Sequence, residues 1–244
     1  MKTIGIDIGG SKMRAVLRDL PAQAGGKRVL AARQVKTPKN LNDFKKEILK
    51  LSTWVLDTQV EGIGIGAAGI ISGTKIVKSP NIKYLRNFDF KKLLGGSATK
   101  LNLGNDAQCF ARAACPKKGT CLAVTLGTGI GRGLAKNAKV KKLKAFEYPE
   151  KWEKEYQKMR GKPKAVMSRE FAGFLAENLM PIVKKYKVTT IIFGGGVTDR
   201  NGFRKKMLNA FRQRPSTSLK ASGLKIQISK LGKNAVAIGA VLLK

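Results

Sequence analysis

Two short glycine-rich segments contain the residues of this sequence that are best suited to bind phosphate. The first is DIGGSK, residues 7–12, and the second is GTG, residues 127–129. Glycine has no Cβ and reaches positive φ angles, so successive backbone N–H groups can converge on one phosphate. Ser11 and Thr128 add hydroxyl donors, and Lys12 adds a positive charge. We therefore predict a phosphate clasp whose backbone groups come from Gly9, Gly10, Gly127 and Gly129.

An acidic residue and a third glycine run extend this interpretation. Asp7 would be repelled by a phosphate, so its expected partner is Mg²⁺, bound directly or through water. A purely structural role as a turn former at a strand end stays open for Asp7. The run 194–196 follows an apolar stretch and precedes an expected helix. There, Gly195 and Gly196 would allow a backbone to approach an adenosine closely.

Strand–turn–strand units are expected to position the first two glycine segments. Isoleucines alternate over 4–8 before the first turn, and apolar residues alternate again over 13–17. The segment 120–137 repeats this layout, which is typical of two half-buried strands joined by a turn. A single hairpin would explain its glycines without any ligand. Two such hairpins, one opening each half of the chain, favour phosphate binding instead.

The rest of the chain alternates between strand and helix patterns. A strand, a polar turn and a helix are predicted for 101–115, and a strand with a closing small-residue helix for 224–244. The segment 138–165 is charged and less regular. Further strands are predicted at 29–37 and 62–71, a short strand and loop at 75–81, and a buried strand leading into the triple-glycine loop at 189–197. Helices are predicted at 40–56, 87–96, 168–186 and 203–213. This alternation predicts an α/β protein.

Histidine and cysteine usage limits the possible chemistry. The chain has no histidine, which excludes Ser–His–Asp and Cys–His catalysis and leaves a carboxylate, Lys, Tyr or Cys as general base. Its three cysteines, Cys109, Cys115 and Cys121, are six residues apart, whereas zinc ligands usually come in closer pairs. We therefore expect reduced thiols and no zinc site.

The strong positive charge predicts attraction to polyanions. Lys and Arg total 49 against 15 Asp and Glu, a net charge of +34. The basic residues are spread over nearly every segment, with a modest concentration at 136–144, and no discrete nucleic-acid motif is visible. We expect non-specific polyanion attraction. Without a membrane-length apolar run or a signal-peptide pattern, the expectation is a soluble, cytoplasmic protein with no membrane partner.

Six stretches together resemble the ROK family in their order along the chain. They are DIGGSKMRAVL (7–17), SPN (79–81), GNDAQCFA (104–111), LGTGIGRG (126–133), FGGGV (193–197) and LGKNAVAIGAVLL (231–243). This family includes bacterial-type glucokinases, fructokinases, N-acetylhexosamine kinases and sugar-responsive repressors. The resemblance implies an α/β fold of two actin-like (ribonuclease H-like) lobes with an interlobe nucleotide and sugar cleft. The lobes would comprise 1–108 with 231–244, and 109–230, in a chain expected to form a homodimer.

The resemblance also implies roles for single residues. Asp106 matches the catalytic base, which takes the proton of a sugar hydroxyl as that oxygen attacks a γ-phosphate. Asn81 and Asn105 match sugar contacts, and the Asn105-Asp106 pair can cap a helix at the same time. These roles imply a sugar kinase that uses ATP and Mg²⁺, with a glucose-like sugar or an N-acetylhexosamine as acceptor.

The sequence departs from the family pattern after the second hairpin. Where the family has Glu-x-Gly-His for sugar binding, this chain has EYPE, so Glu147 fits the first position and Glu150 replaces the histidine. The Cys/His zinc motif is absent, and 147–162 bridges the gap. Three alternatives stay open: a catalytically weak sugar or nucleotide sensor, a nucleic-acid-associated protein, and polyphosphate in place of ATP as the phosphoryl donor.

Overall fold

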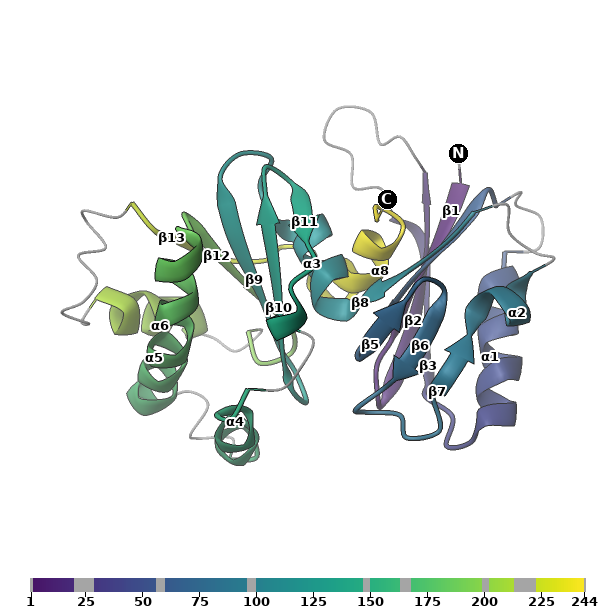
Figure 1. Cartoon of the computed structure of the whole chain (residues 1–244), viewed down its shortest axis with the longest axis horizontal. Helices are drawn as coiled ribbons and strands as arrows, with labels where there is room; N and C mark the ends of the chain where they lie inside the picture. The colour runs from purple at the N-terminus through teal and green to yellow at the C-terminus, as the bar shows by residue number, and fades with distance from the viewer. Residues whose placement is uncertain are drawn as a thin grey trace. The chain divides into compact units, whose positions relative to one another are not determined.

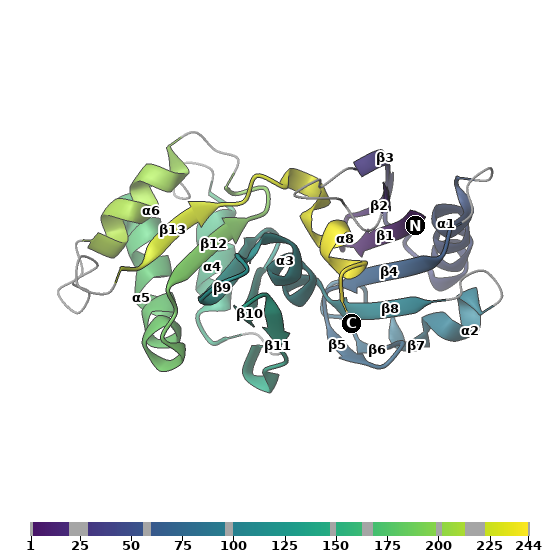
Figure 2. The same ribbon diagram turned by 90° about the horizontal axis from the view of Figure 1, so that it is seen from above.

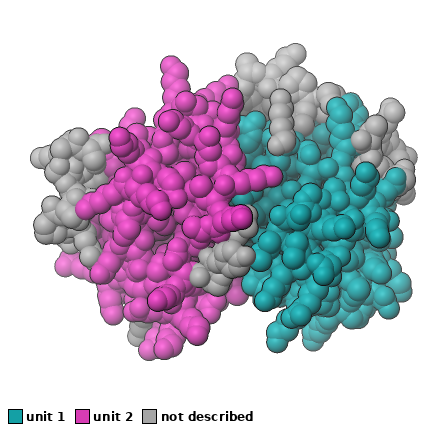
Figure 3. Space-filling view, viewed as in Figure 1, with its two compact units in different colours: residues 1–113, 234–244 teal, residues 114–233 magenta. Residues whose placement is uncertain are grey.

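A computed structural model describes most of the chain as two compact units. Unit 1 comprises Met1–Ala113 and Asn234–Lys244, and unit 2 comprises Ala114–Lys233 (Figure 3). Each unit contains a five-stranded sheet with helices against it (Figure 1). The described residues are 2–19, 29–55, 60–95, 100–146, 150–162, 168–198, 202–212 and 223–243.

The sheet of unit 1 combines an antiparallel hairpin with parallel strands. Its order is β3-β2-β1-β4-β8, in which β1, β2 and β3 are antiparallel and β1, β4 and β8 are parallel. The strands are β1 (Lys2–Ile8), β2 (Lys12–Asp19), β3 (Val29–Lys36), β4 (Gly62–Ala67) and β8 (Leu101–Asn105). A smaller sheet contains β5 (Ile70–Ser72), β6 (Lys75–Lys78) and β7 (Arg86–Asp89), and the helices are α1 (Leu41–Thr53), α2 (Phe90–Leu94), α3 (Asp106–Ala114) and α8 (Ala235–Ala240).

Alternating isoleucine and glycine determine what packs on each face of this sheet. The isoleucines of β1 and β4 are buried in one core with Phe44 of α1, while α8 lies along the opposite face (Figure 1). A Cβ on Gly5 would lie 2.0 Å from the carbonyl oxygen of Ala237, and one on Gly64 would lie 2.4 Å from the carbonyl carbon of Ala240. The helix α8 can therefore pack this close only against glycines.

The sheet of unit 2 repeats the same plan. Its order is β11-β10-β9-β12-β13, with β10 antiparallel to its neighbours and β9, β12 and β13 parallel (Figure 2). The strands are β9 (Thr120–Leu126), β10 (Ile130–Lys136), β11 (Lys139–Lys141), β12 (Thr190–Gly194) and β13 (Lys225–Ile228). The described residues of this unit include the α-helices α4 (Glu153–Arg160), α5 (Arg169–Tyr186) and α6 (Phe203–Arg212), and short 3₁₀ helices lie at Lys144–Phe146 and Gly232–Asn234. The repeated hairpin-plus-parallel-strand arrangement confirms the internal repeat and the α/β class.

Most predicted elements are confirmed, with two informative differences. In the segment predicted as a helix at 87–96, the helix α2 begins only at Phe90, because Asp89 accepts a hydrogen bond from the Lys91 backbone N–H and caps it. The irregular region 138–165 contains α4, which the charged sequence did not indicate. The helix α5 continues through Pro181 to Tyr186.

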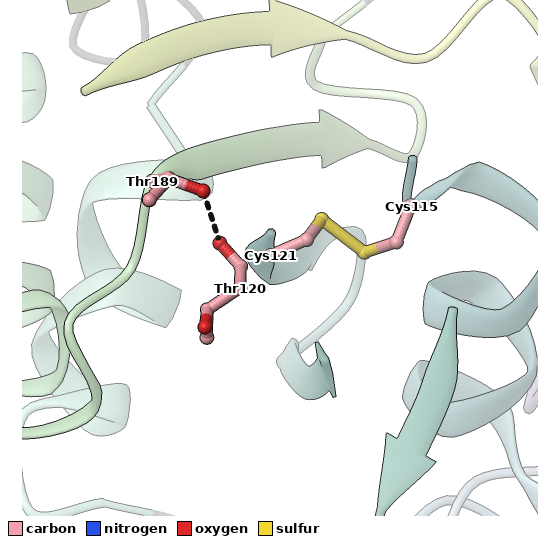
Figure 4. Close-up of a disulfide and its surroundings, with 4 residues drawn as sticks. All are labelled: Cys115, Thr120, Cys121 and Thr189. Carbon is pink, nitrogen blue, oxygen red and sulfur yellow. Dashed lines mark hydrogen bonds between the residues drawn. A yellow bond between two sulfur atoms is a disulfide. The ribbon is translucent and has the colours of Figure 1, made fainter. Parts of the chain in front are cut away.

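The expectation of three reduced thiols is wrong for two of them. Cys115 and Cys121 form a disulfide that closes the loop between α3 and β9 (Figure 4), and Cys109 is a buried free thiol. The loop brings the two Cα atoms to 5.8 Å, within the range that a disulfide requires. Sequence spacing does not reveal this return of the chain. Among the described residues, no cluster of three or more His, Cys, Asp or Glu side chains could hold a metal.

Candidate active site

Two carboxylates meet at one edge of the unit 1 sheet. Asp7 lies near the end of β1, and Asp106 directly follows β8 and begins α3. Because β1, β4 and β8 are parallel, their carboxyl ends share that edge. The pKa of Asp7 is raised from 3.8 to about 7, mainly by burial and then by the charge of Asp106, while Arg14 acts in the opposite direction. The two carboxylates are therefore close enough to interact electrostatically.

Arg14 only partly compensates for these carboxylates. It is the cross-strand neighbour of Asp7 in β2. Its Nη1 donates to Asn234 Oδ1 at 3.3 Å, and its Nη2 donates to Gln34 Oε1. Arg14 lowers the pKa of Asp7, but burial and the charge of Asp106 outweigh it.

The Asn105-Asp106 pair caps α3. The side-chain oxygens of both residues accept from the Ala107 backbone N–H, at 3.0 and 2.8 Å. Asn105 also donates from Nδ2 to the carbonyl oxygen of Gly69 at 3.2 Å. These bonds fix the Asn105 amide between the β4–β5 turn and α3, and they place the Asp106 carboxylate at the first turn of the helix.

The first glycine turn is tied to a residue that the sequence did not single out. Within the turn, Gly9 N–H donates to the carbonyl of Lys12 at 3.1 Å. Thr37, just after β3, donates its hydroxyl to the Gly9 carbonyl at 2.7 Å and its N–H to the Ser11 carbonyl at 3.1 Å. The side chains of Ser11 and Lys12 stay exposed. Thr37 thus binds the carbonyl groups of the turn and leaves the turn's side chains accessible.

Asn81 lies directly against this turn. A Cβ on Gly10 would be 2.9 Å from the Cβ of Asn81, so the two backbones approach closely. Asn81 itself is exposed. Unit 1 therefore brings together eight of the predicted residues, which are Asp7, Gly9, Gly10, Ser11, Lys12, Asn81, Asn105 and Asp106.

Helix α4 supports the second glycine turn in unit 2. Tyr156 donates its hydroxyl to the Gly127 carbonyl at 3.0 Å, and Glu153 Oε1 accepts from the Ile130 N–H at 3.2 Å. Burial raises the pKa of Tyr156 further above its ordinary value, so the hydroxyl stays protonated and remains a donor. The same Glu153 oxygen would lie 2.7 Å from a Cβ on Gly129, and Thr128 between the two glycines is exposed. No local sequence pattern could have indicated this support.

The third glycine run lies beside the second turn. Gly195 has φ +94°, and a Cβ on it would lie 2.4 Å from the carbonyl oxygen of Leu126, the residue before Gly127. That carbonyl accepts from the Val197 N–H at 3.3 Å. A Cβ on Gly196 would meet nothing within 4 Å. Unit 2 therefore assembles the second group of predicted residues, which are Gly127, Thr128, Gly129, Gly195 and Gly196.

Of the two glutamates predicted to contact sugar, the structure describes only Glu150. Glu147 lies outside the described residues. The Glu150 carboxylate forms an ion pair with Arg132, whose side chain is 2% exposed while that of Glu150 is 41% exposed. The Phe146 ring lies 5.1 Å from the same guanidinium. Glu150 is therefore held in place by a buried cation.

Comparison with known proteins gives the class to which this fold and site belong. The model of the ROK family matches residues 3–142, and the chain belongs to that family. An N-acetylmannosamine kinase of Salmonella typhimurium is 32% identical over 147 residues, which cover 57% of this chain and 49% of the relative. The chain thus spans about half the length of the curated relatives it matches.

Solved structures confirm the predicted actin-like fold. A ROK family glucokinase from Streptomyces griseus, in complex with glucose and AMPPNP, has a TM-score of 0.80 and 22% identity, covering 99% of each chain. A ROK family protein from Streptococcus pneumoniae in complex with sucrose has a TM-score of 0.81 and 18% identity, covering 99% of this chain and 97% of that one. An inorganic polyphosphate/ATP-glucomannokinase from Arthrobacter has a TM-score of 0.74 and 21% identity, covering 99% and 97%.

Among the helices in the described part of the chain, none combines the length and the apolar character needed to cross a membrane.

Proposed function

We propose that this protein is an ATP- and Mg²⁺-dependent kinase that phosphorylates a hydroxyl of a glucose-like sugar or an N-acetylhexosamine. The observation that carries the proposal is the Asp7–Asp106 carboxylate pair, which lies in the same unit as the Gly9–Lys12 turn. Membership of the ROK family supports the reaction class. Relatives named as an N-acetylmannosamine kinase and a glucokinase support the acceptor class.

In this proposal Asp106 is the general base. Its carboxylate accepts the proton of the sugar hydroxyl as that oxygen attacks the γ-phosphorus, and ADP departs with the bridging oxygen. The cap at Ala107 holds Asp106 at the start of α3, so the base is positioned before the sugar binds. Asn81, Asn105, Glu147 and Glu150 are the proposed sugar contacts.

A magnesium ion fits the Asp7 environment. Mg²⁺ prefers hard oxygen ligands and is usually held by one or two carboxylates together with substrate phosphates. The raised pKa of Asp7 reflects a partly buried, desolvated carboxylate beside a second one, an environment that a divalent cation would stabilise. We therefore propose Asp7 as the residue that holds Mg²⁺. When bound, the ion would neutralise charge on the phosphates.

The glycine segments are the proposed nucleotide contacts. Their accessible groups match what a phosphate chain needs: backbone N–H donors, two exposed hydroxyl side chains and one lysine. The open space beside Gly196 supports a close approach by the nucleotide at the third run. The proposed contacts are Gly9, Gly10, Ser11, Lys12, Gly127, Thr128, Gly129, Gly195 and Gly196.

A coupled ADP-release assay tests the proposal. Glucose, N-acetylglucosamine, N-acetylmannosamine and fructose are offered with ATP and Mg²⁺ to the wild type, to Asp106→Asn and to the control Asp43→Asn on α1. We expect sugar-dependent turnover that falls about 10²- to 10⁴-fold in Asp106→Asn, the usual contribution of a general base, and persists in the control.

Two outcomes of this assay would reject the proposal. Equal turnover by Asp106→Asn and wild type would remove the base assignment. Sugar-induced thermal stabilisation without ADP release would point to a sensor. Replacing ATP by polyphosphate, with sugar phosphate as the readout, identifies the donor.

A further inference from the structure

A lysine-lined hollow lies in unit 2, at the end of the sheet opposite to the second glycine turn. It has a volume of about 460 Å³ and is formed by the β10–β11 hairpin, the residues after it and the end of α5. Its lysines, all exposed, are Lys136, Lys141, Lys142, Lys185 and Lys187. We call it the lysine hollow.

The lysine hollow is at the opposite end of the sheet from the second glycine turn. Thr120, the first residue of β9, lines the hollow, and Leu126, the last residue of β9, leads into the turn. Six residue steps along a strand span about 20 Å. Lys136 pairs with Thr120, so β10 places its lysine at the same far end. The hollow is therefore a separate site from the proposed nucleotide contacts.

The lining of the lysine hollow is basic and apolar. Among the residues that the structure describes, no acidic side chain lines it. The ion pairs identified among the described residues, Lys75–Asp89 and Arg132–Glu150, lie elsewhere. In the hairpin register, Lys136 pairs with Lys139, while Lys141 pairs with Leu134, so three lysines share one face. These like charges repel one another, and a bound polyanion would relieve that repulsion.

The walls of the hollow strengthen its field. Leu134 is 4% exposed, and Leu143 and Tyr186 are partly buried. Apolar walls around charges of one sign focus the potential into a concave site, whereas lysines on a convex surface are screened by water. The loop closed by the disulfide carries exposed lysines at 117 and 118. Gly119 of this loop exchanges hydrogen bonds with Asn137, the neighbour of Lys136. The loop therefore extends the positive region.

The lining residues indicate the chemistry of the anion. Lysine acts as a point charge toward phosphate and lacks the planar fork by which arginine reads base edges. The aromatic residue of the hollow is Tyr186, whose ring already contacts Phe146 at 6.0 Å, edge to face, and the Lys185 ammonium at 5.6 Å. A nucleobase needs an open aromatic face for stacking. We propose that the lysine hollow binds a linear inorganic phosphate chain, such as tripolyphosphate.

Isothermal titration calorimetry with tripolyphosphate tests this proposal in the full chain. The test variant is Lys141→Glu/Lys142→Glu. The matched control is Lys91→Glu/Lys92→Glu on α2, another adjacent exposed pair that changes the net charge equally. We expect the test variant to bind at least about tenfold more weakly, because each lost charge-assisted contact is worth about that factor. Its salt slope should fall by about one for each lysine lost, and the control should keep the wild-type affinity.

A second double substitution, which removes charge without reversing it, keeps the proposal testable if the Lys141→Glu/Lys142→Glu variant misfolds. Lys136→Gln/Lys187→Asn removes two charges, and asparagine tolerates the left-handed backbone of Lys187, with φ 50°. Its comparison is Lys91→Gln/Lys92→Gln. Equal weakening in test and control pairs, or no saturable binding, would overturn the proposal. So would displacement of the phosphate chain by a charge-matched RNA oligonucleotide at lower concentration. Asp106→Asn should bind tripolyphosphate normally, which separates this proposal from the kinase proposal.

Discussion

At the scale of single residues, Asp7 shows a conflict between stability and the proposed function. Burial and the neighbouring Asp106 oppose its ionisation, so the metal-free protein keeps its pKa at about 7 instead of 3.8. Such strain is typical of sites that are completed by a cation. Both aspartates could be singled out from sequence, Asp7 because it precedes the first glycine turn and Asp106 because it matches the catalytic base of the family that the sequence resembles. Their mutual proximity could not be derived from local patterns, since it depends on the pairing of β1, β4 and β8.

The Asp7→Asn variant should reveal this conflict in the absence of metal. Because the folded pKa of Asp7 lies above the unfolded value, the folded state binds the proton more tightly. The free energy of unfolding therefore decreases as pH rises from 3.8 toward 7, by at most about 4 kcal/mol. The variant should lack this decrease and be more stable than wild type at pH 8. Urea unfolding in EDTA across this pH range measures it, and parallel pH profiles would contradict the prediction.

At the scale of elements, local patterns identified the glycine hairpins but not what supports them. The alternation of isoleucine with other residues in β1 indicates a strand because it has period two. Thr37 and α4, which hold the two turns, act through tertiary contacts and could not be predicted. The segment 147–162 was expected, from the resemblance to the ROK family, to bridge the gap left by an absent zinc motif. It contains α4, and its Tyr156 and Glu153 contact the second turn and the strand that follows it.

Removing the Tyr156 hydroxyl tests whether α4 positions the second glycine turn. Tyr156→Phe keeps the ring and loses the bond to Gly127, and Thr189→Val loses an equivalent bond to the Thr120 carbonyl at the other end of β9 (Figure 4). Each change should cost about 1 kcal/mol of stability. In the kinase assay, Tyr156→Phe should raise the KM for ATP several-fold while Thr189→Val leaves it unchanged. An equal KM in both variants would make α4 purely structural.

The disulfide should stabilise the link between α3 and β9. Closing so short a loop reduces unfolded-state entropy by an amount worth about 2 kcal/mol. Reductant should therefore lower the Tm of the wild type, and Cys115→Ala/Cys121→Ala should have a low Tm that reductant does not change. Calorimetric scans with and without reductant give this comparison. A wild-type Tm that is unchanged after complete reduction of the disulfide would show that the bond adds no stability.

At the scale of the whole molecule, the net charge of +34 dominates the solution behaviour. Composition alone predicted polyanion attraction. It could not indicate where lysines surround a hollow, because that depends on the β10–β11 register and on the end of α5. Spread over both units, these charges also repel one another in the folded state.

Salt should therefore stabilise the protein. The Debye length shortens from about 30 Å at 0.01 M to about 3 Å at 1 M, which screens the repulsion between lysines. We expect the Tm to rise steadily with sodium chloride over this range, most steeply at its lower end. Scanning fluorimetry provides the measurement, with the Lys91→Glu/Lys92→Glu variant expected to respond less. A Tm that falls with added chloride would contradict self-repulsion.

The central claim is that Asp106 drives phosphoryl transfer to a sugar, and separating binding from transfer tests it most directly. Transfer of labelled γ-phosphate to the preferred sugar is measured alongside calorimetric binding of sugar and nucleotide. Asp106→Asn should bind both ligands within a few-fold of wild type and transfer the label at least about 10² times more slowly. Transfer at the wild-type rate by Asp106→Asn would contradict the account.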